Sequence, residues 1–166
     1  MLLGAANYFY TYDFSKGTIL ESADGGRSFA AIYSGLDVLP SYASQSQLAS
    51  VLGTVRRDLW LATPNGLWHI NGASGAPVKT AYVQAAYSVG FGLAATGQAY
   101  PAVYISAKIN NVYGIYQSID GGATWRQLND AKHQWGGINS VAGDMRVFGR
   151  VYVGAMRGGV IVGNPQ

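Results

Sequence analysis

The sequence predicts an all-β protein, and features of its composition and patterning support that fold class. Its 166 residues include 23 glycines and 12 tyrosines but a single glutamate, Glu21. Glycine weakens helices, whereas aromatic side chains favour pleated surfaces. With 49% hydrophobic and 11% charged residues, the chain has the composition of a globular domain rather than a disordered one. The remaining feature is an internal repeat.

The repeat is visible in the segment Ser118–Trp125, SIDGGATW, which echoes Ser22–Phe29, SADGGRSF, at a distance of 96 residues. A unit at half that distance begins at Gly66-Leu67-Trp68, which aligns with Gly114-Ile115-Tyr116. Another unit begins at Arg150, where Val151 lies 48 residues after Val103. The period is therefore 48 residues, and fixed periods of about 20 to 50 residues mark solenoids and propellers.

Each period predicts a small β-sheet. In the second unit, Leu48–Gly53 supplies a small-residue strand suited to crowding near an axis, followed by strands at Asp58–Thr63 and Gly66–Ile70. Four strands per repeat are typical of a propeller blade. The predicted blades cover about residues 2–34, 47–82, 83–130 and 137–163, and the last stops after its third strand. Since propellers usually close with about 4 to 8 blades, we expect a partial β-propeller in one domain.

The repeated octet is the Asp-box, a pattern found in sialidases, sortilin-like receptors and several propeller hydrolases. A short aspartate there accepts hydrogen bonds from backbone N–H groups, the glycines take positive φ, and the aromatic residue packs beneath the turn. An aspartate held by such donors has a lowered pKa and is a poor general acid. We therefore assign a structural role to Ser22, Asp24, Gly26 and Phe29, and to Ser118, Asp120, Gly122, Thr124 and Trp125.

From about Asn7 to Gly163 the chain resembles the C-terminal part of the second propeller of glycoside hydrolase family 74, the xyloglucanases and oligoxyloglucan reducing-end-specific cellobiohydrolases. The resemblance rests on motifs in matching order: Asn7–Asp13, Ser22–Phe29, Asp58–Ala62, Gly66–Trp68, Tyr87–Gly92, Tyr100–Ile105, the octet, Leu128–Asp130, His133–Trp135, Gly143-Asp144 and Gly149–Gly154.

The resemblance implies an inverting hydrolase of β-1,4-glucan in which two propellers face each other across a cleft. The family's two catalytic aspartates lie early in each propeller, in Asp-x-Gly-Gly contexts that this chain lacks outside its Asp-boxes. We therefore expect no catalytic residue here, and we expect the chain alone to be inactive. The parent enzyme is expected to be secreted, although the first residues, MLLGAANYFY, do not form a signal peptide.

Several other kinds of site are disfavoured. The remaining acids are expected to lie at the surface or in turns: Asp13, Asp37, Asp58, Asp130 and Asp144. His69 and His133 have no third ligand nearby in sequence, and there is no cysteine, so we predict no metal and no cofactor. The net charge is +3, but Arg56-Arg57 is the only adjacent basic pair, which does not favour nucleic-acid binding. No apolar stretch approaches the roughly 18 residues of a membrane span.

Sugar binding needs aromatic faces for stacking and amides that hydrogen-bond hydroxyl groups. The loop from Ile109 to Tyr113, read as four residues longer than its counterpart in the second unit, and the loop from His133 to Gly137 are the best candidates. We predict that the substrate-binding residues are Asn111, Tyr113, His133, Gln134 and Trp135.

Two functions remain open. In the first, the chain forms one wall of the glycan cleft of a xyloglucan hydrolase, with xyloglucan or a related β-glucan and the missing blades as its partners. In the second, it is a non-catalytic carbohydrate-binding or self-assembling partial propeller, because two copies would supply about eight blades, enough to close a ring. A sialidase or sortilin-like propeller is a weaker alternative, since it would share only the Asp-box.

Overall fold

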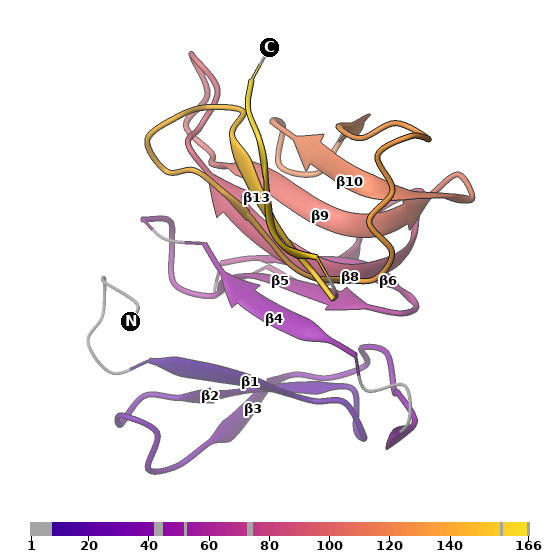
Figure 1. Ribbon diagram of the computed structural model, residues 1–166. Helices are drawn as coiled ribbons and strands as arrows, with labels where there is room; N and C mark the ends of the chain where they lie inside the picture. Colours follow the sequence, from indigo (N-terminus) through magenta and orange to yellow (C-terminus); the bar gives the residue numbers. More distant parts are fainter. Residues whose placement is uncertain (1–7, 42–44, 52, 73–74, 157, 166) are drawn as a thin grey trace.

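The computed structural model describes residues 8–41, 45–51, 53–72, 75–156 and 158–165, which form four antiparallel sheets and no α-helix (Figure 1). The first sheet contains β1 (Phe9–Asp13), β2 (Thr18–Ser22) and β3 (Ala30–Tyr33). The second contains β4 (Gln47–Ser50), β5 (Asp58–Thr63), β6 (Gly66–Asn71) and β7 (Val78–Lys79). The third contains β8 (Val83–Gly92), β9 (Ala102–Ile109), β10 (Val112–Ser118) and β11 (Arg126–Gln127). The fourth contains β12 (Ile138–Gly143), β13 (Val151–Ala155) and β14 (Gly159–Gly163).

Within every sheet, each strand pairs with the next one along the chain, and the sheets follow one another in space in chain order (Figure 1). This arrangement confirms the predicted fold class, an all-β partial propeller.

Four strands are present in the second and third sheets, whereas the outer two sheets have three described strands each. The 96-residue repeat aligns β2 with β10 and β1 with β9, so the described part of the first sheet contains no counterpart of the innermost strand, β8. The fourth sheet lacks a described counterpart of the outermost strand, β11. Residues 2–7 of the first predicted blade lie outside the described residues, and the described part of that blade contains three strands.

The middle strands read as unbroken apolar runs because neighbouring sheets cover both of their faces. All six residues of β5 are buried. Leu59 and Leu61 pack in a core shared with the first sheet, whereas Trp60 and Ala62 pack in a core shared with the third. Successive side chains of a strand point to opposite faces, so one strand supplies two cores. A third core, which contains Tyr104, joins the third and fourth sheets.

Small residues let the inner strands approach each other closely. A Cβ atom added to Gly90 of β8 would collide with the carbonyl oxygen of Val141 in β12 and lie 2.9 Å from the Cα of Ala142. Gly92 is similarly close to Gly143, with 2.9 Å from its added Cβ to the Gly143 Cα. The absence of side chains at these positions therefore permits backbone-to-backbone packing between β8 and β12.

Candidate functional site

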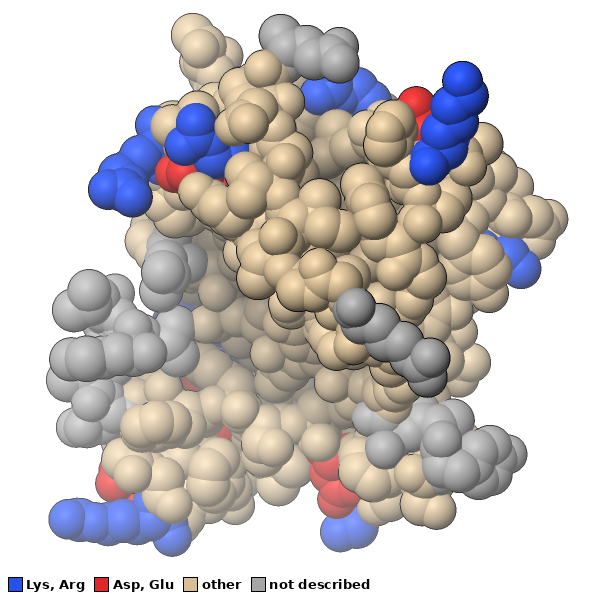
Figure 2. Space-filling view, viewed as in Figure 1, with Lys and Arg blue, Asp and Glu red and all other residues tan. Residues whose placement is uncertain are grey.

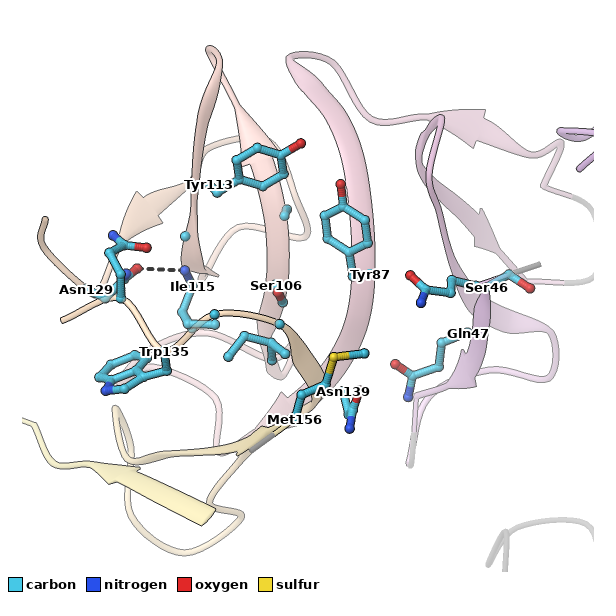
Figure 3. Close-up of a pocket in the computed structure, with 17 residues that line it drawn as sticks. Ser46, Gln47, Tyr87, Ser106, Tyr113, Ile115, Asn129, Trp135, Asn139 and Met156 are labelled. Carbon is cyan, nitrogen blue, oxygen red and sulfur yellow. Dashed lines mark hydrogen bonds between the residues drawn. The ribbon is translucent and has the colours of Figure 1, made fainter. Parts of the chain in front are cut away.

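A hollow of about 550 Å³ opens beside the first residues of β4 and β12 and the inner part of the β9–β10 hairpin (Figure 3). Its wall is completed by the connection between β11 and β12 and by Met156, which follows β13. The residues that line it are Gln45, Ser46, Gln47, Tyr87, Ser106, Ala107, Tyr113, Gly114, Ile115, Asn129, Gln134, Trp135, Gly136, Gly137, Ile138, Asn139 and Met156. The last three sheets all contribute, so this hollow is a product of their packing.

Three aromatic side chains line the hollow. The rings of Tyr87 and Tyr113 lie 6.1 Å apart, centroid to centroid, at an angle of 32°. Burial, reinforced by a hydrogen bond with Tyr113, raises the pKa of Tyr87 to about 12. Its hydroxyl therefore stays neutral at physiological pH and can donate as well as accept a hydrogen bond. Trp135 is 36% exposed, which leaves indole surface available for stacking on a sugar ring.

Five carboxamide side chains share the lining, and the structure already uses some of them. Gln47 Oε1 accepts a hydrogen bond from the N–H of Val89 at 2.9 Å, beside an irregularity in the β8–β9 pairing. Gln134 Nε2 donates to the carbonyl oxygen of Asp130 at 2.9 Å. Gln45 and Asn139 also line the hollow. Carboxamides can both donate and accept, which suits them to hydroxyl groups.

No charged side chain is among the described residues that line the hollow. On the face shown in Figure 2, too, the charged side chains lie around the periphery and leave the centre uncharged. Glycoside hydrolysis with inversion needs two carboxyl groups about 6.5 to 9.5 Å apart. The hollow therefore has groups that could bind a neutral, hydroxyl-rich ligand, and its lining supplies no acid–base pair.

The loop that carries three of the predicted site residues is braced by Asp130. Its Oδ1 accepts hydrogen bonds from the backbone N–H of His133 at 2.9 Å and of Lys132 at 2.9 Å, and His133 Nδ1 lies 2.7 Å away. The bond with His133 lowers the pKa of the Asp130 carboxyl, as do the two backbone donors. Gln134 and Trp135 line the hollow, whereas His133 is not part of the lining.

The other two predicted residues lie on the β9–β10 hairpin. Tyr113 lines the hollow, but Asn111 does not. Asn110 and Asn111 have φ values of 50° and 64°, so they form a two-residue turn, and Asn111 exchanges hydrogen bonds with Gln84. The expected longer loop was wrong: the extra residues lengthen β9 and β10 relative to β5 and β6.

Sequence reasoning missed Tyr87, Asn129 and the amides on β4 and β12. Tyr87 stood out in the sequence only as the first residue of the family motif Tyr87–Gly92. Asn139 is the second residue of β12, Gln47 is the first residue of β4, and Gln45 lies two residues before it.

The turns at Ser22–Phe29 and Ser118–Trp125 have closely similar hydrogen bonds. In the second turn, the N–H of Thr124 donates to Asp120 Oδ1 at 2.9 Å and the N–H of Gly122 donates to Ser118 Oγ at 2.8 Å. Gly121 and Gly122 have φ values of 68° and 90°. Burial opposes ionisation of Asp120, but its bonds with Thr124 lower its pKa overall. Its oxygens are therefore engaged inside the turn.

The first turn repeats this pattern with Ser22 and Asp24, whose pKa the hydroxyl and N–H of Ser28 lower to about 2. The two aromatic residues differ. Trp125 packs edge to face on Trp60, with ring centroids 6.4 Å apart. Phe29 is 44% exposed, so the expectation that it packs beneath its turn was wrong.

Asp58 was wrongly expected at the surface or in a turn, and Asp37, which is half-buried, also bonds side chains of a neighbouring sheet. Asp58 is 2% exposed, and its Oδ1 accepts a hydrogen bond from the hydroxyl of Tyr100 at 2.8 Å and lies 2.9 Å from His69 Nε2. Asp37 Oδ2 accepts hydrogen bonds from Thr63 Oγ1 and Trp68 Nε1, at 2.6 and 2.9 Å. Both acids join neighbouring segments and lie outside the lining of the hollow.

The other expected turn acids are where the sequence placed them. Asp13 bonds Ser15 two residues later, and Asp144 Oδ1 accepts from the N–H of Arg146 at 2.7 Å. Among the described residues, no three His, Asp or Glu side chains are grouped so that they could hold a metal ion. In the described ranges there is also no helix long and apolar enough to cross a membrane.

Comparison with known proteins identifies long relatives of this chain. No protein-family profile matches it. A xyloglucanase from Paenibacillus sp. is 37% identical over 161 residues, which are 93% of this chain but 15% of the relative. A xyloglucanase from Acetivibrio thermocellus is 38% identical over 156 residues, 93% of this chain and 18% of the relative. The chain therefore spans less than a fifth of the length of these curated relatives.

Solved structures of family 74 enzymes are similar to this chain as well. The glycoside hydrolase family 74 enzyme of Niastella koreensis superposes with a TM-score of 0.86 at 33% identity, over 97% of this chain and 23% of that one. The family 74 xyloglucanase of Xanthomonas campestris gives a TM-score of 0.77 at 32% identity, over 98% of this chain and 23% of that one. Over nearly its whole length, this chain belongs to glycoside hydrolase family 74 and corresponds to a fragment of the larger enzymes.

Proposed function

We propose that this chain is the C-terminal portion of the second propeller of a secreted xyloglucan hydrolase, where it forms one wall of the glycan cleft. The observation that carries the proposal is the hollow between the last three sheets. It combines the aromatic faces of Tyr87, Tyr113 and Trp135 with carboxamides and no charged side chain. Neutral sugars need this combination of stacking surface and hydrogen-bonding groups.

The same lining argues that the chain alone binds glycan weakly and hydrolyses none. The two Asp-box carboxylates are engaged within their turns, and the buried Asp58 and the half-buried Asp37 are bonded to neighbouring side chains. In this proposal, the catalytic carboxylates and the opposite wall of the cleft belong to other parts of the intact enzyme.

Binding to tamarind xyloglucan, measured by affinity electrophoresis, tests the proposal. The protein should be retarded by the polysaccharide, and Trp135→Ala should lose most of that retardation. Phe29→Ala is the matched control, because Phe29 is 44% exposed and lies on the turn at the opposite end of the sheets. Equal retardation of Trp135→Ala and the parent would refute a binding role for the hollow.

A reducing-sugar assay on the same polysaccharide tests the catalytic half of the proposal. We expect no release above a protein-free blank. Release that persists after a further purification step and disappears in an aspartate variant would show that a catalytic acid is present after all.

The second candidate is a self-assembling module, and β14 favours it. Val160 and Val162 are 70% and 48% exposed on one face of this strand, and no strand of the described residues pairs with its outer edge. Exposed apolar edge strands promote pairing between chains. Light scattering over a range of concentrations distinguishes the candidates: a concentration-independent monomer would argue against assembly.

A further inference from the structure

We propose that Asn129 is a positioning residue of the hollow, which places Gln134 and Trp135 for ligand binding by tethering the loop Asp130–Gly137 to the edge of β10. The loop itself offers the indole face of Trp135 and the carboxamide of Gln134. Asn129 acts on it through two hydrogen bonds, one to the sheet and one to the loop. The binding consequence rests on the proposed function, whereas the tether itself does not.

Asn129 extends the pairing of β10 beyond the end of β11. Gln127 of β11 pairs with Tyr116, and the N–H of Leu128 donates to the carbonyl oxygen of Ile115 at 2.8 Å. The N–H of Ile115 then donates to Asn129 Oδ1 at 2.7 Å (Figure 3). A side-chain oxygen thus satisfies a donor of β10 beyond the end of its pairing with β11, at the point where the chain leaves the sheet.

The other end of the same carboxamide holds the loop. Asn129 Nδ2 donates to the carbonyl oxygen of His133 at 3.0 Å. Within the loop, Asp130 accepts hydrogen bonds from the N–H of His133 and, through its carbonyl oxygen, from Gln134 Nε2. At the far end, the N–H of Met156 donates to the carbonyl oxygen of Gly137 at 2.9 Å. The loop is therefore braced internally and tied to the sheets near both of its ends.

Gly114 provides the space that this tether needs. A Cβ atom added to Gly114 would lie 2.9 Å from Asn129 Oδ1 and 2.8 Å from Gln127 Nε2. The φ of Gly114 is not in the left-handed region, so an alanine would not strain the backbone but would push the carboxamide away. Gly114→Ala therefore perturbs the tether without removing Asn129.

The loop lies between two cavities, so its position decides which cavity the indole of Trp135 lines. Trp135 lines the hollow on one side and, on the other, a second cavity of about 530 Å³ beside β13 and β14. A displaced loop would transfer indole surface from one cavity to the other. A loosened tether should therefore lower glycan affinity even though Asn129 lies at the base of the loop.

The experiment compares Asn129→Ala, Asn129→Asp and Gly114→Ala with the parent by hydrogen exchange and by glycan binding. Asp keeps the acceptor for Ile115 but loses the donor to His133. The control is Thr54→Val, which removes a single loop hydrogen bond, from Thr54 Oγ1 to the carbonyl oxygen of Val51, at the other end of β4. Urea unfolding of every variant separates loop loosening from global destabilisation.

In Asn129→Ala, we expect amide exchange between Ala131 and Gly137 to accelerate at least tenfold. Two hydrogen bonds are lost, and the loss of each typically raises the equilibrium constant for loop opening by a factor of about five. Xyloglucan affinity should fall about five- to tenfold, with a smaller loss in Asn129→Asp and in Gly114→Ala. Acrylamide quenching of Trp135, isolated by subtracting Trp135→Phe, should also change.

Loop exchange no faster than in Thr54→Val would overturn the tether. Accelerated exchange with unchanged affinity would overturn the positioning role, provided that Trp135→Ala abolishes binding. If the parent itself does not bind xyloglucan, the proposed function fails, and hydrogen exchange together with quenching still decides whether Asn129 holds the loop.

Discussion

The only glutamate of the chain provides the most quantitative test of how the blades are held together. Glu21 of β2 is 7% exposed and lies against two arginines from the connection between β4 and β5. Arg57 binds it with two hydrogen bonds, from Nε at 2.9 Å and Nη2 at 2.8 Å, and Arg56 adds two more. The pair with Arg57, opposed by burial and assisted by Arg56, lowers the pKa of Glu21 to about 2. The glutamate therefore stabilises the junction between the first and second sheets while it is ionised.

The magnitude follows from that pKa. A depression from 4.5 to about 2 corresponds to about 3 kcal/mol of folding free energy. Because the folded-state pKa is the lower one, this contribution is fully present above the unfolded pKa of 4.5 and is lost as the pH falls towards about 2. Removal of one partner from a buried ion pair costs about 3 to 5 kcal/mol, which agrees.

Urea unfolding followed by tryptophan fluorescence measures the effect. Glu21→Gln should lower the free energy of unfolding by about 3 kcal/mol at neutral pH, and the difference from the parent should vanish as the pH approaches the folded-state pKa. Asp13→Asn is the control, since Asp13 pairs with the exposed Lys16, whose side chain is 76% accessible, and should change stability little. A stability difference that is small at neutral pH, or that persists unchanged in acid, would refute the assigned ion-pair role.

Three further substitutions test the packing and the site. Gly122→Ala should destabilise the protein by about 1 to 3 kcal/mol, because φ is 90° and the new Cβ would lie 2.6 Å from Trp60 Cη2. Urea unfolding measures the loss, and unchanged stability would argue against that contact. Gly90→Ala should destabilise the protein by a similar amount, about 1 to 3 kcal/mol, and lower its thermal midpoint, because its Cβ would collide with the carbonyl oxygen of Val141. Asn111→Gly should preserve both folding and retardation by xyloglucan, because the turn already has positive φ and Asn111 does not line the hollow. Reduced retardation of this variant in affinity electrophoresis would show that Asn111 binds the glycan.

The repeat shows how far sequence patterning predicts this molecule. The spacing of Ser118–Trp125 and Ser22–Phe29 set the 48-residue period, and the structure contains four successive sheets. The same spacing did not distinguish Trp125, which packs on Trp60, from Phe29, which is largely exposed. The difference depends on which sheet lies beside each turn, and neither octet contains that information.

The hairpin at Asn110 and Asn111 shows why loop length is hard to assign from an alignment of repeats. Extra residues between two recognisable strands can lengthen the loop or lengthen both strands. Two adjacent asparagines favour the positive φ of a tight turn, and β9 and β10 are accordingly longer than β5 and β6. The turn chemistry is present in the sequence, and its consequence is longer strands rather than a longer loop.

By itself, the sequence determined the fold class, the repeat and the family, because these depend on strand periodicity, turn residues and motif order along the chain. Only the tertiary structure decided which side chains meet. Tyr87, Asn129 and Asn139 come from separate elements, yet they line one hollow, and Glu21 is buried by arginines more than thirty residues away. The physical reason is that the middle strands bury both faces against neighbouring sheets, so the surroundings of a side chain are set by neighbours that are distant in the chain.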